Sequence, residues 1–358
     1  MATPQEELGI RIEEALRQRF AERTAVAETY GESFASLWRA AAEHALGGKL
    51  IRPRLLLEAH RALSASYGGS VDSVAAVNVA ADVELLHYAF LLHDDVIDGD
   101  LIRRRRPNLI GVLAAGRGDE PGDADLHWAR SSAILMGDLL LSTSLLGFAR
   151  ARVSTGTRVR LLDLIEHTIV ETVAGEHTDV GLSDGRIAPD LRTILAMSTY
   201  KTATYSFSLP LRAAAILAGA SPEVEEHLAA IGRHLGLAFQ LQDDILCVFG
   251  DAALHGKDPY SDLREGKETA IIAYARMTSA WPHIEGRFGS LTLSDDEAAA
   301  VREHLRTCGA ESYAQSLVTD ELAAASAVLR TAEESRSISA EVAATVRSLL
   351  ARVESRRA

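Results

Sequence analysis

Three aspartates stand at the end of a long apolar stretch of the chain. The segment from Val71 onward is apolar on nearly every side, and it ends in Asp94, Asp95 and Asp98. Such a segment predicts a buried helix, on which aspartates at these spacings share one sector. Buried carboxylates are costly unless something compensates them, and acidic groups are unfavourable at a helix C-terminus. Grouped oxygen ligands suit Mg²⁺, which completes its shell with water and substrate phosphate. A solvated acidic helix end is the alternative interpretation.

Four consecutive arginines, Arg103 to Arg106, follow this cluster within one or two turns. The run fits two interpretations. It can be a solvated basic face paired to the aspartates. It can equally be a clamp for a diphosphate, because a guanidinium group binds phosphate through two parallel hydrogen bonds.

A second acidic pair, Asp243 and Asp244, lies in another apolar stretch that predicts a helix. The position where a further aspartate would share their sector is Cys247, and Gly250 can end the helix before Asp251. Together with the first cluster, this pair predicts two buried helices that face each other across a cavity and hold a shared magnesium cluster. A diphosphate that bridges such metals departs with its charge neutralised, which is metal-assisted electrophilic catalysis.

Other basic residues stand where anions could bind. They are Lys49, Arg52, Lys201, Lys257 and Lys267. Lys49 follows a glycine pair, and Lys201-Thr202 is expected at a helix start, where free N–H groups and the helix dipole favour anions. For any one of these lysines, a solvated surface position is the simpler interpretation. The place of Lys257 and Lys267, shortly after the second acidic pair, favours a binding role.

Helical periodicity dominates the elements that must position these residues. Apolar residues recur at three- and four-residue spacing along most of the chain, and helix-forming Ala, Leu, Glu and Arg are abundant. Ser221-Pro222 predicts an N-cap followed by proline at the first helical position. No domain boundary stands out. The sequence therefore predicts an all-α protein in which residues 1–358 form a single domain, a length that one helical core can hold.

Bulk properties narrow the partners and the location. The formal net charge of −13 argues against nucleic acid, because phosphate backbones require Lys and Arg. Two cysteines give no disulfide framework, and the charged N-terminus has no apolar signal core. We therefore expect a cytoplasmic protein. The apolar stretch 133–149 is interrupted by Asp138 and is short for a membrane span, so we expect a buried core helix and no integral membrane segment.

In order and spacing, the motifs resemble the trans-isoprenyl diphosphate synthase, or polyprenyl synthetase, family, closest to bacterial geranylgeranyl and short-chain prenyl diphosphate synthases. They span residues 47–267 and read GGKxxRP (47–53), H-x5-HDDxxD (87–98), RRxxP (103–107), KT (201–202), FQxxDD (239–244) and GD-x4-GK-x4-DL-x2-GK (250–267). The resemblance implies an antiparallel helical bundle around a deep central cavity, the isoprenoid synthase type I fold. It also implies a homodimer and three magnesium ions per active site.

The resemblance assigns roles by position. As metal ligands it implies Asp94, Asp95, Asp98, Asp243 and Asp244. For the allylic diphosphate it implies Arg103, Lys201 and Lys257. For isopentenyl diphosphate it implies Lys49, Arg52, His87 and Arg104, with Lys267 as a further substrate-binding residue. Around the ionising carbon it implies Lys201, Thr202 and Gln240. The implied reaction is ionisation of the allylic substrate, attack by the isopentenyl double bond, and loss of a proton to the departing pyrophosphate.

The sequence departs from the family pattern at a few positions. Leu50 replaces an arginine, Cys247 the last aspartate of the second motif, Arg105 a glycine and Asp258 a proline. None of these changes removes a residue to which chemistry is assigned. We expect the metal site to survive, with weaker binding.

Product length depends, in this family pattern, on the residues just before the first acidic motif. Phe90 lies one turn before Asp94 on nearly the same helix face, so its ring would form a floor that stops the growing chain, while Ala89 leaves a gap beside it. One large and one small residue predict the twenty-carbon geranylgeranyl product, with farnesyl and the twenty-five-carbon product open. The alternative is that Phe90 is only a core residue.

Two other functions share part of this pattern. A class I terpene cyclase would have the helical fold and a first acidic motif, but it requires a second motif of Asn, Ser or Thr, and Glu that the chain lacks. A non-catalytic subunit of a heteromeric synthase would be expected to have lost aspartates or arginines that are present here.

Overall fold

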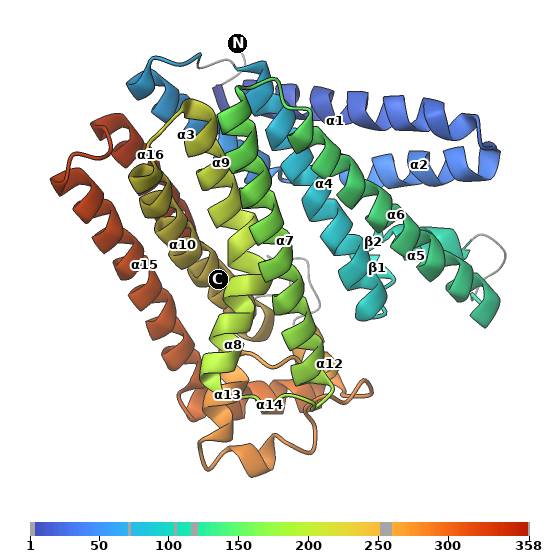
Figure 1. Ribbon diagram of the computed structural model, residues 1–358. Helices are drawn as coiled ribbons and strands as arrows, with labels where there is room; N and C mark the ends of the chain where they lie inside the picture. The colour runs from blue at the N-terminus through green and yellow to red at the C-terminus, as the bar shows by residue number, and fades with distance from the viewer. Residues whose placement is uncertain (1–3, 71–72, 104–105, 116–120, 251–259, 357–358) are drawn as a thin grey trace. The chain divides into compact units, whose positions relative to one another are not determined.

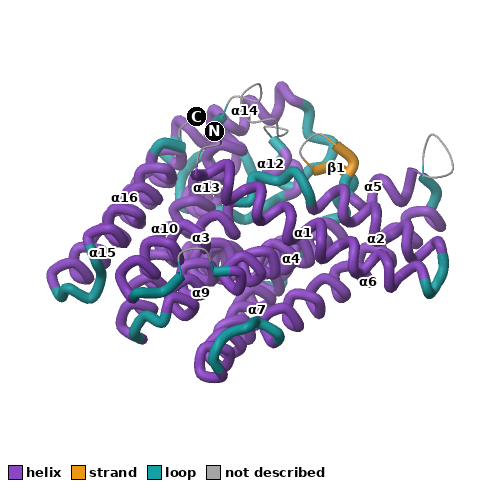
Figure 2. Tube along the Cα trace, turned by 90° about the horizontal axis from the view of Figure 1, so that it is seen from above, coloured by secondary structure: helices purple, strands orange, loops and turns teal. Residues whose placement is uncertain are grey.

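The computed structural model of the chain is almost entirely helical (Figures 1 and 2). It describes residues 4–70, 73–103, 106–115, 121–250 and 260–356. The all-α prediction is therefore confirmed. The chain divides into two compact units, one of Met1–Ile165 with Ala213–Ala220, and one of Glu166–Arg212 with Ser221–Ala358. The single domain expected from the sequence stays a prediction.

The first unit holds the N-terminal helices and a short hairpin. Its elements are α1 (Pro4–Glu28), α2 (Glu32–Ala45), α3 (Ile51–Tyr67), α4 (Val74–Ile97), β1 (Ile102–Arg103), β2 (Arg106–Pro107), α5 (Leu109–Ala114), α6 (Asp123–Ala149), the first part of α7 (Thr155–Ser183) and most of α9 (Leu209–Ala218).

The second unit holds the rest of α7 and the helices that follow it. They are α8 (Leu191–Ser198), the π-helix η2 (Thr199–Ser208), α10 (Pro222–Phe249), α12 (Ser261–Glu265), α13 (Ala270–Arg276), the short 3₁₀ helix η3 (Trp281–His283), α14 (Asp295–Thr307), α15 (Ala310–Glu334) and α16 (Ala340–Glu354).

Helix α4 is the core of the first unit. The Ser73 side chain accepts a hydrogen bond from the Ala76 N–H and caps its start. Residues 79–89 are all buried, so the helix is covered on every side, as its continuous apolar sequence predicts. By length and composition both α4 and α6 could cross a membrane, but a core helix passes the same test. In α4, 67% of the most apolar window is buried inside the protein, which fits a core helix.

A buried ion pair joins three helices of this unit. Asp82 of α4 is fully buried, and Arg19 of α1 lies 3.2 Å from its carboxylate. The Ser144 hydroxyl of α6 donates to the Asp82 carbonyl at 2.8 Å, and Gly147 leaves room for the carboxylate, since a Cβ there would lie 2.1 Å from it. Burial raises the pKa of Asp82 to about 7, against the opposing influence of Arg19. The carboxylate thus fixes how α1, α4 and α6 pack.

Helix α10 is the core of the second unit. Its start has the predicted form, with the Ser221 side chain accepting from the Val224 N–H and Pro222 in the first turn. The helix packs along α15 on one side and η2 on another. Contact with η2 is close because Gly232 and Gly236 have no side chains. A Cβ on Gly236 would lie 2.5 Å from the Cα of Ala203.

The expected helix start at Lys201-Thr202 is wrong. The Asp190 side chain accepts from the Thr193 N–H at 3.0 Å and caps α8 well before Lys201. Helix α8 then continues directly into η2, and Lys201 lies inside that π-helix. The N–H groups of a helix start are consequently not offered to an anion at this position. π-Helical turns often mark functional positions, and this one carries two residues of the predicted site.

The close packing of α10 on η2 gives a stability prediction. We expect Gly236→Ala to lower the free energy of unfolding by about 1–3 kcal/mol, because the added methyl group meets backbone that cannot move aside. Urea denaturation followed by circular dichroism measures this change. Gly156→Ala is the matched control, since no atom lies within 4 Å of its added Cβ. It should leave stability unchanged or raise it by up to about 1 kcal/mol. Equal losses in both variants would contradict the packing argument.

Candidate active site

The first aspartate cluster lies at the C-terminal end of α4. Asp95 is buried, Asp94 is partly buried, and the helix ends at Ile97. Asp98 is the exposed C-cap residue, and its N–H donates to the Asp94 carbonyl at 2.9 Å. The three aspartates therefore follow one another around the last turn of the helix, as their spacing predicts, and they differ in exposure.

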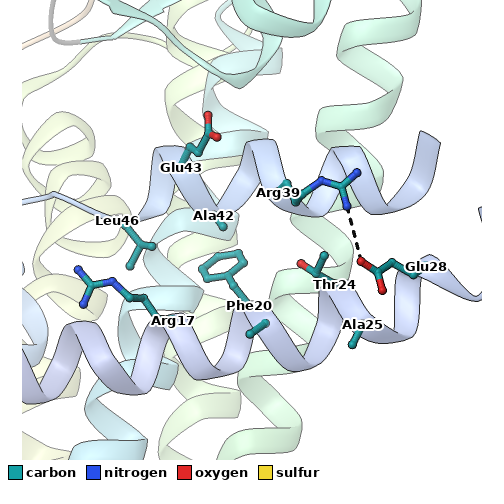
Figure 3. A pocket seen from close by; sticks show the side chains of 10 residues that line it. Arg17, Phe20, Thr24, Ala25, Glu28, Arg39, Ala42, Glu43 and Leu46 are labelled. Atoms are coloured by element: carbon teal, nitrogen blue, oxygen red, sulfur yellow. Dashed lines mark ion pairs between the residues drawn. The ribbon is translucent and has the colours of Figure 1, made fainter. Parts of the chain in front are cut away.

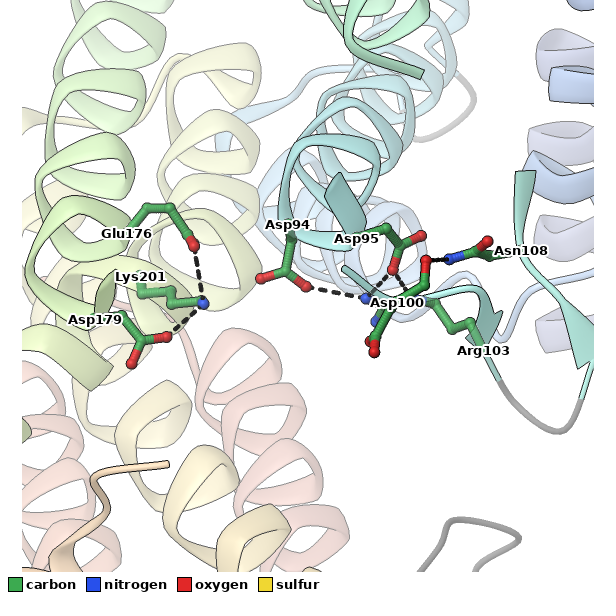
Figure 4. Close-up of polar contacts among 8 residues, drawn as sticks. All are labelled: Asp94, Asp95, Asp100, Arg103, Asn108, Glu176, Asp179 and Lys201. Carbon is green, nitrogen blue, oxygen red and sulfur yellow. Dashed lines mark hydrogen bonds and ion pairs between the residues drawn. The ribbon is translucent and has the colours of Figure 1, made fainter. Parts of the chain in front are cut away.

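Arg103 compensates the buried charge (Figure 4). Its Nη2 donates to Asp94 Oδ2 at 3.0 Å, and its Nε donates to Asp95 Oδ1 at 2.8 Å. Burial raises the pKa of Asp95, and this effect outweighs the opposing influence of Arg103. For Arg103, the interpretation as a basic group paired to the aspartates is confirmed. Arg104 and Arg105 lie outside the described residues.

Asn108 holds the hairpin that carries Arg103. In this hairpin Arg103 pairs with Arg106 in antiparallel register. The buried Asn108 follows it; its Nδ2 donates to the Asp100 carbonyl at 2.8 Å, and its Oδ1 accepts from the Gly111 N–H at 2.9 Å. The second bond caps α5. Asn108 was not among the predicted residues, although an asparagine directly before an apolar helical segment is an N-cap signal.

Of the expected isopentenyl diphosphate residues, Lys49 lies in the turn before α3, Arg52 on α3 and His87 on α4. The glycine pair leads into a left-handed turn, in which Gly47 has φ 84° and the buried Leu50 has φ 51°. A non-glycine residue in this region is strained, and such strain persists where surrounding packing holds it. The turn leaves Lys49 exposed and Arg52 partly buried in the first turn of α3, while His87 is buried on α4.

A groove between α1 and α2 is separate from all of these residues (Figure 3). It has a volume of about 470 Å³ and an apolar floor that includes Phe20, Ala42 and Leu46. Arg17 and Arg39 are its basic residues, and Arg39 pairs with Glu28 at 3.8 Å. No residue of the predicted site lines this groove, so it is not the candidate active site.

The second acidic pair lies near the end of α10. Asp243 is partly buried and accepts a hydrogen bond from Arg356 Nη2 at 3.0 Å. The Arg356 guanidinium also lies over the Phe239 ring, 3.8 Å from its centre. Gln242 Nε2 donates to the Val353 carbonyl at 2.9 Å and joins α10 to the end of α16. The chain's C-terminal segment thereby brings an arginine to Asp243, which the sequence analysis did not foresee.

Asp244 is buried and is held by Gln240, whose Nε2 donates to its Oδ1 at 2.8 Å. Burial raises the pKa of Asp244 to about 7; Asp262 raises it further, and Lys267 lowers it. The negative charge on this carboxylate is therefore costly, and Lys267 offsets only part of that cost. A buried oxygen ligand of this kind fits a divalent metal ion.

Cys247 is buried at the position where a further aspartate would share the sector of the acidic pair. Its Sγ lies 3.5 Å from the Ser261 Oγ, and burial raises the pKa of the thiol to about 12. Helix α10 ends at Phe249 with Gly250 as C-cap, as expected, and Asp251 lies outside the described residues.

Lys201 is bound by two carboxylates of α7 (Figure 4). Its Nζ lies 2.6 Å from Asp179 Oδ2 and 3.0 Å from Glu176 Oε2. One turn further along η2, the Thr204 hydroxyl donates to Glu171 at 2.8 Å. The sequence analysis missed these three carboxylates of α7, because nothing in their spacing indicates which helix they face.

The remaining predicted residues complete the second unit. Thr202 is partly buried in η2. Asp262 raises the pKa of Lys267 above its usual range, against the opposing effect of burial, so Lys267 stays charged. Lys257 lies outside the described residues.

Within the described ranges, no group of three or more His, Cys, Asp or Glu side chains is arranged as a ready metal site. Asp94, Asp95 and Asp243 are instead bonded to arginines, and Asp244 is bonded to Gln240. This arrangement still fits Mg²⁺, which needs only one or two protein carboxylates when phosphate and water fill the rest of its shell. The shared metal cluster across a cavity stays a prediction.

Comparison with known proteins finds similar sequences. Residues 35–300 match the family described as Polyprenyl synthetase. A (2E,6E)-farnesyl diphosphate synthase of Mycobacterium tuberculosis is 34% identical over 285 residues, covering 75% of this chain and 69% of that protein. A geranylfarnesyl diphosphate synthase of Aeropyrum pernix is 32% identical over 275 residues, covering 75% and 79%.

A solved structure extends the likeness to the whole fold. The geranylgeranyl pyrophosphate synthase of Corynebacterium glutamicum, complexed with isoprenyl diphosphate and magnesium, superposes with a TM-score of 0.88. It is 28% identical, and the match covers 99% of this chain and 100% of that one. The chain therefore has the helical isoprenoid synthase fold that the resemblance implied.

The Asn108 contacts give a prediction for the Arg103 hairpin. We expect Asn108→Ala to lower the free energy of unfolding by about 1–3 kcal/mol, because it removes a helix cap and a buried hydrogen bond. Asn108→Ser keeps a capping oxygen and should lose less. Urea denaturation measures both losses, and hydrogen exchange of the amides between Leu101 and Asn108 should speed up in the alanine variant. An alanine variant with unchanged stability and exchange would refute the anchoring role.

Proposed function

This chain belongs to the polyprenyl synthetase family and is a prenyltransferase, and from that premise we propose that it condenses isopentenyl diphosphate with an allylic diphosphate in a Mg²⁺-dependent reaction. The allylic substrate would be dimethylallyl, geranyl or farnesyl diphosphate. The observation that carries the proposal is the contact of Arg103 with Asp94 and Asp95, which joins carboxylates for a metal to a guanidinium group for phosphate.

Oxygen ligands on two helices support the magnesium requirement. Asp94, Asp95 and Asp98 of α4 and Asp243 and Asp244 of α10 would hold the metal, three ions per site by family resemblance. When bound, Mg²⁺ neutralises the charge that develops on the departing pyrophosphate. The Corynebacterium relative, named as a complex with magnesium and isoprenyl diphosphate, supports the same ligand chemistry.

Arg103 would act on the phosphate group directly. Its guanidinium has five N–H donors, and its Nε and Nη2 already make three hydrogen bonds to Asp94 and Asp95. Remaining donors can bind phosphate oxygens while these bonds keep the planar group in place. Arg103 would then pair with the aspartates when substrate is absent and also bind the diphosphate when substrate is present. Lys49, Arg52, His87, Arg104, Lys257 and Lys267 remain proposed diphosphate ligands.

Gln240 and Thr202 would steady the cation that forms when the allylic bond ionises. Because Gln240 Nε2 donates to Asp244, its amide orientation is fixed and its carbonyl oxygen is left as a partly negative group. The partly buried Thr202 would offer its hydroxyl oxygen. The proton lost from the isopentenyl unit would pass to the departing pyrophosphate, so this mechanism requires no protein base.

We propose geranylgeranyl diphosphate as the product. The relatives are named for farnesyl, geranylfarnesyl and geranylgeranyl products, so family membership leaves the length open. The support comes from α4, where Phe90 is only partly buried one turn before Asp94, while Ala89 is completely buried. A partly buried ring is more available to a ligand than a fully packed core residue.

We also propose a homodimer. Trp128, Leu135 and Leu146 lie along one face of α6 and are 59%, 60% and 41% exposed. Their spacings place them within a narrow stripe of the helix. Exposed large apolar side chains on one face of a helix suit a protein interface. The cytoplasmic location, the lack of an integral membrane segment and the lack of nucleic-acid binding stay predictions.

The transferase is tested with purified protein, Mg²⁺, labelled isopentenyl diphosphate and each allylic primer in turn. We expect a prenyl diphosphate series that ends at one length and disappears with EDTA.

Asp94→Ala should lose at least about 100-fold in turnover because a metal ligand is gone, with an unchanged circular dichroism spectrum. Asp163→Ala removes an exposed aspartate of α7 and should keep normal activity. Near-normal activity of Asp94→Ala would rule out the metal assignment, and hydrocarbon release would favour a cyclase. A chain inactive with every primer would favour the non-catalytic subunit.

Product length is tested at Phe90. Phe90→Ala should lengthen the main product by at least one five-carbon unit, because the growing chain loses the ring that stops it. Chromatography of the dephosphorylated products measures the shift. Phe34→Ala removes a partly buried ring of α2 and should leave the product unchanged. If Phe90→Ala also gave the unchanged product, Phe90 would be only a core residue.

A further inference from the structure

Lys201, an expected diphosphate ligand, is bound by two acidic side chains in this structure. Glu176 and Asp179 lie one turn apart on α7, and both contact the Lys201 ammonium group, at 3.0 and 2.6 Å. The exposed fraction of the side chain is only 16% for Lys201, 22% for Glu176 and 9% for Asp179. Little water or salt screens these charges. The group of three therefore carries one net negative charge.

The backbone fixes this arrangement. Gly175, directly before Glu176, lets α7 approach η2 so closely that a Cβ at Gly175 would lie 2.2 Å from the backbone nitrogen of Lys201. The contact between Glu171 and Thr204 holds the same two helices together one turn away. Two helices held at this distance leave the Lys201 side chain little freedom to leave the carboxylates. The packing of α7 against η2 therefore sets the contacts of Glu176 and Asp179 with Lys201.

We propose that Glu176 is a positioning residue that, with Asp179, neutralises Lys201 and so weakens the hold of this lysine on pyrophosphate. Within one group, a pyrophosphate meets the attraction of Lys201 and the repulsion of the two carboxylates. An unpaired lysine would bind the allylic substrate and the released pyrophosphate alike, and tight binding of both does not speed turnover. Partial neutralisation keeps the lysine as a hydrogen-bond donor and lets the product depart.

The neighbouring charges agree with this interpretation. Lys267 is held charged mainly by Asp262; Lys201 and Asp179 also act on it, with opposite signs. Both lysines of this part of the second unit are thus matched by carboxylates. Without Glu176, Lys201 would keep its contact with Asp179, and the local charge would rise by one unit.

The inference rests on the proposed function, and pyrophosphate binding tests it separately from turnover. Isothermal calorimetry with inorganic pyrophosphate and excess Mg²⁺ compares the unaltered chain with Glu176→Gln, which keeps the shape and removes the charge. We expect the dissociation constant to fall by roughly three- to tenfold. In steady state, KM for the allylic diphosphate should fall by a similar factor, and kcat should not rise.

Two variants serve as controls. Glu176→Asp keeps the charge and should restore a dissociation constant within about twofold of the unaltered chain. Glu166→Gln removes an exposed carboxylate from the same helix and should change nothing. Unchanged or weaker pyrophosphate binding by Glu176→Gln would overturn the inference, since a merely structural role gives that result. Absence of prenyl transfer by the unaltered chain would instead refute the proposed function, while the calorimetric comparison would still decide the role of Glu176.

Discussion

Buried carboxylates that are paired with basic or amide groups dominate the chemistry of this protein. A carboxylate taken out of water loses its hydration, and the fold can keep it only when a donor replaces that hydration. Arg103 does so for Asp94 and Asp95, Gln240 for Asp244, and Arg19 for the fully buried Asp82. The raised pKa values of Asp82 and Asp244 show that this compensation is incomplete. The remaining cost is what a divalent cation could relieve at Asp244.

The basic side chains consequently have two tasks. In the chain by itself, Arg103 and Arg356 neutralise aspartates on α4 and α10. In the proposed reaction, the same kind of guanidinium group binds phosphate. Lys201 differs because its partners are two carboxylates outside the acidic motifs. Each of the two cations meets two carboxylates, but those of Arg103 belong to the proposed metal site and those of Lys201 do not.

Close helix packing makes these contacts possible. Glycines at positions 175, 232 and 236 bring α7 and α10 against η2 at distances that a side chain would forbid. In the first unit, Gly147 gives room to the buried Asp82 in the same way. The π-helical geometry of η2 then sets where Lys201 and Thr204 point along α7. Positions with no side chain thus control where the charged side chains meet.

Local sequence was enough to predict the helical class, the cap at Ser221, the family, and the positions of both acidic motifs. These features depend on local periodicity and on spacing along one helix, which a single chain segment contains. The partners of the motifs were decided only by the tertiary structure. Glu176, Asp179 and Arg356 are ordinary charged residues in the sequence, and the helix start expected at Lys201 was wrong because Asp190 caps that helix earlier. A contact between α7 and η2, or between α10 and the end of the chain, depends on how distant helices pack. Side-chain spacing within one helix carries no information about that packing.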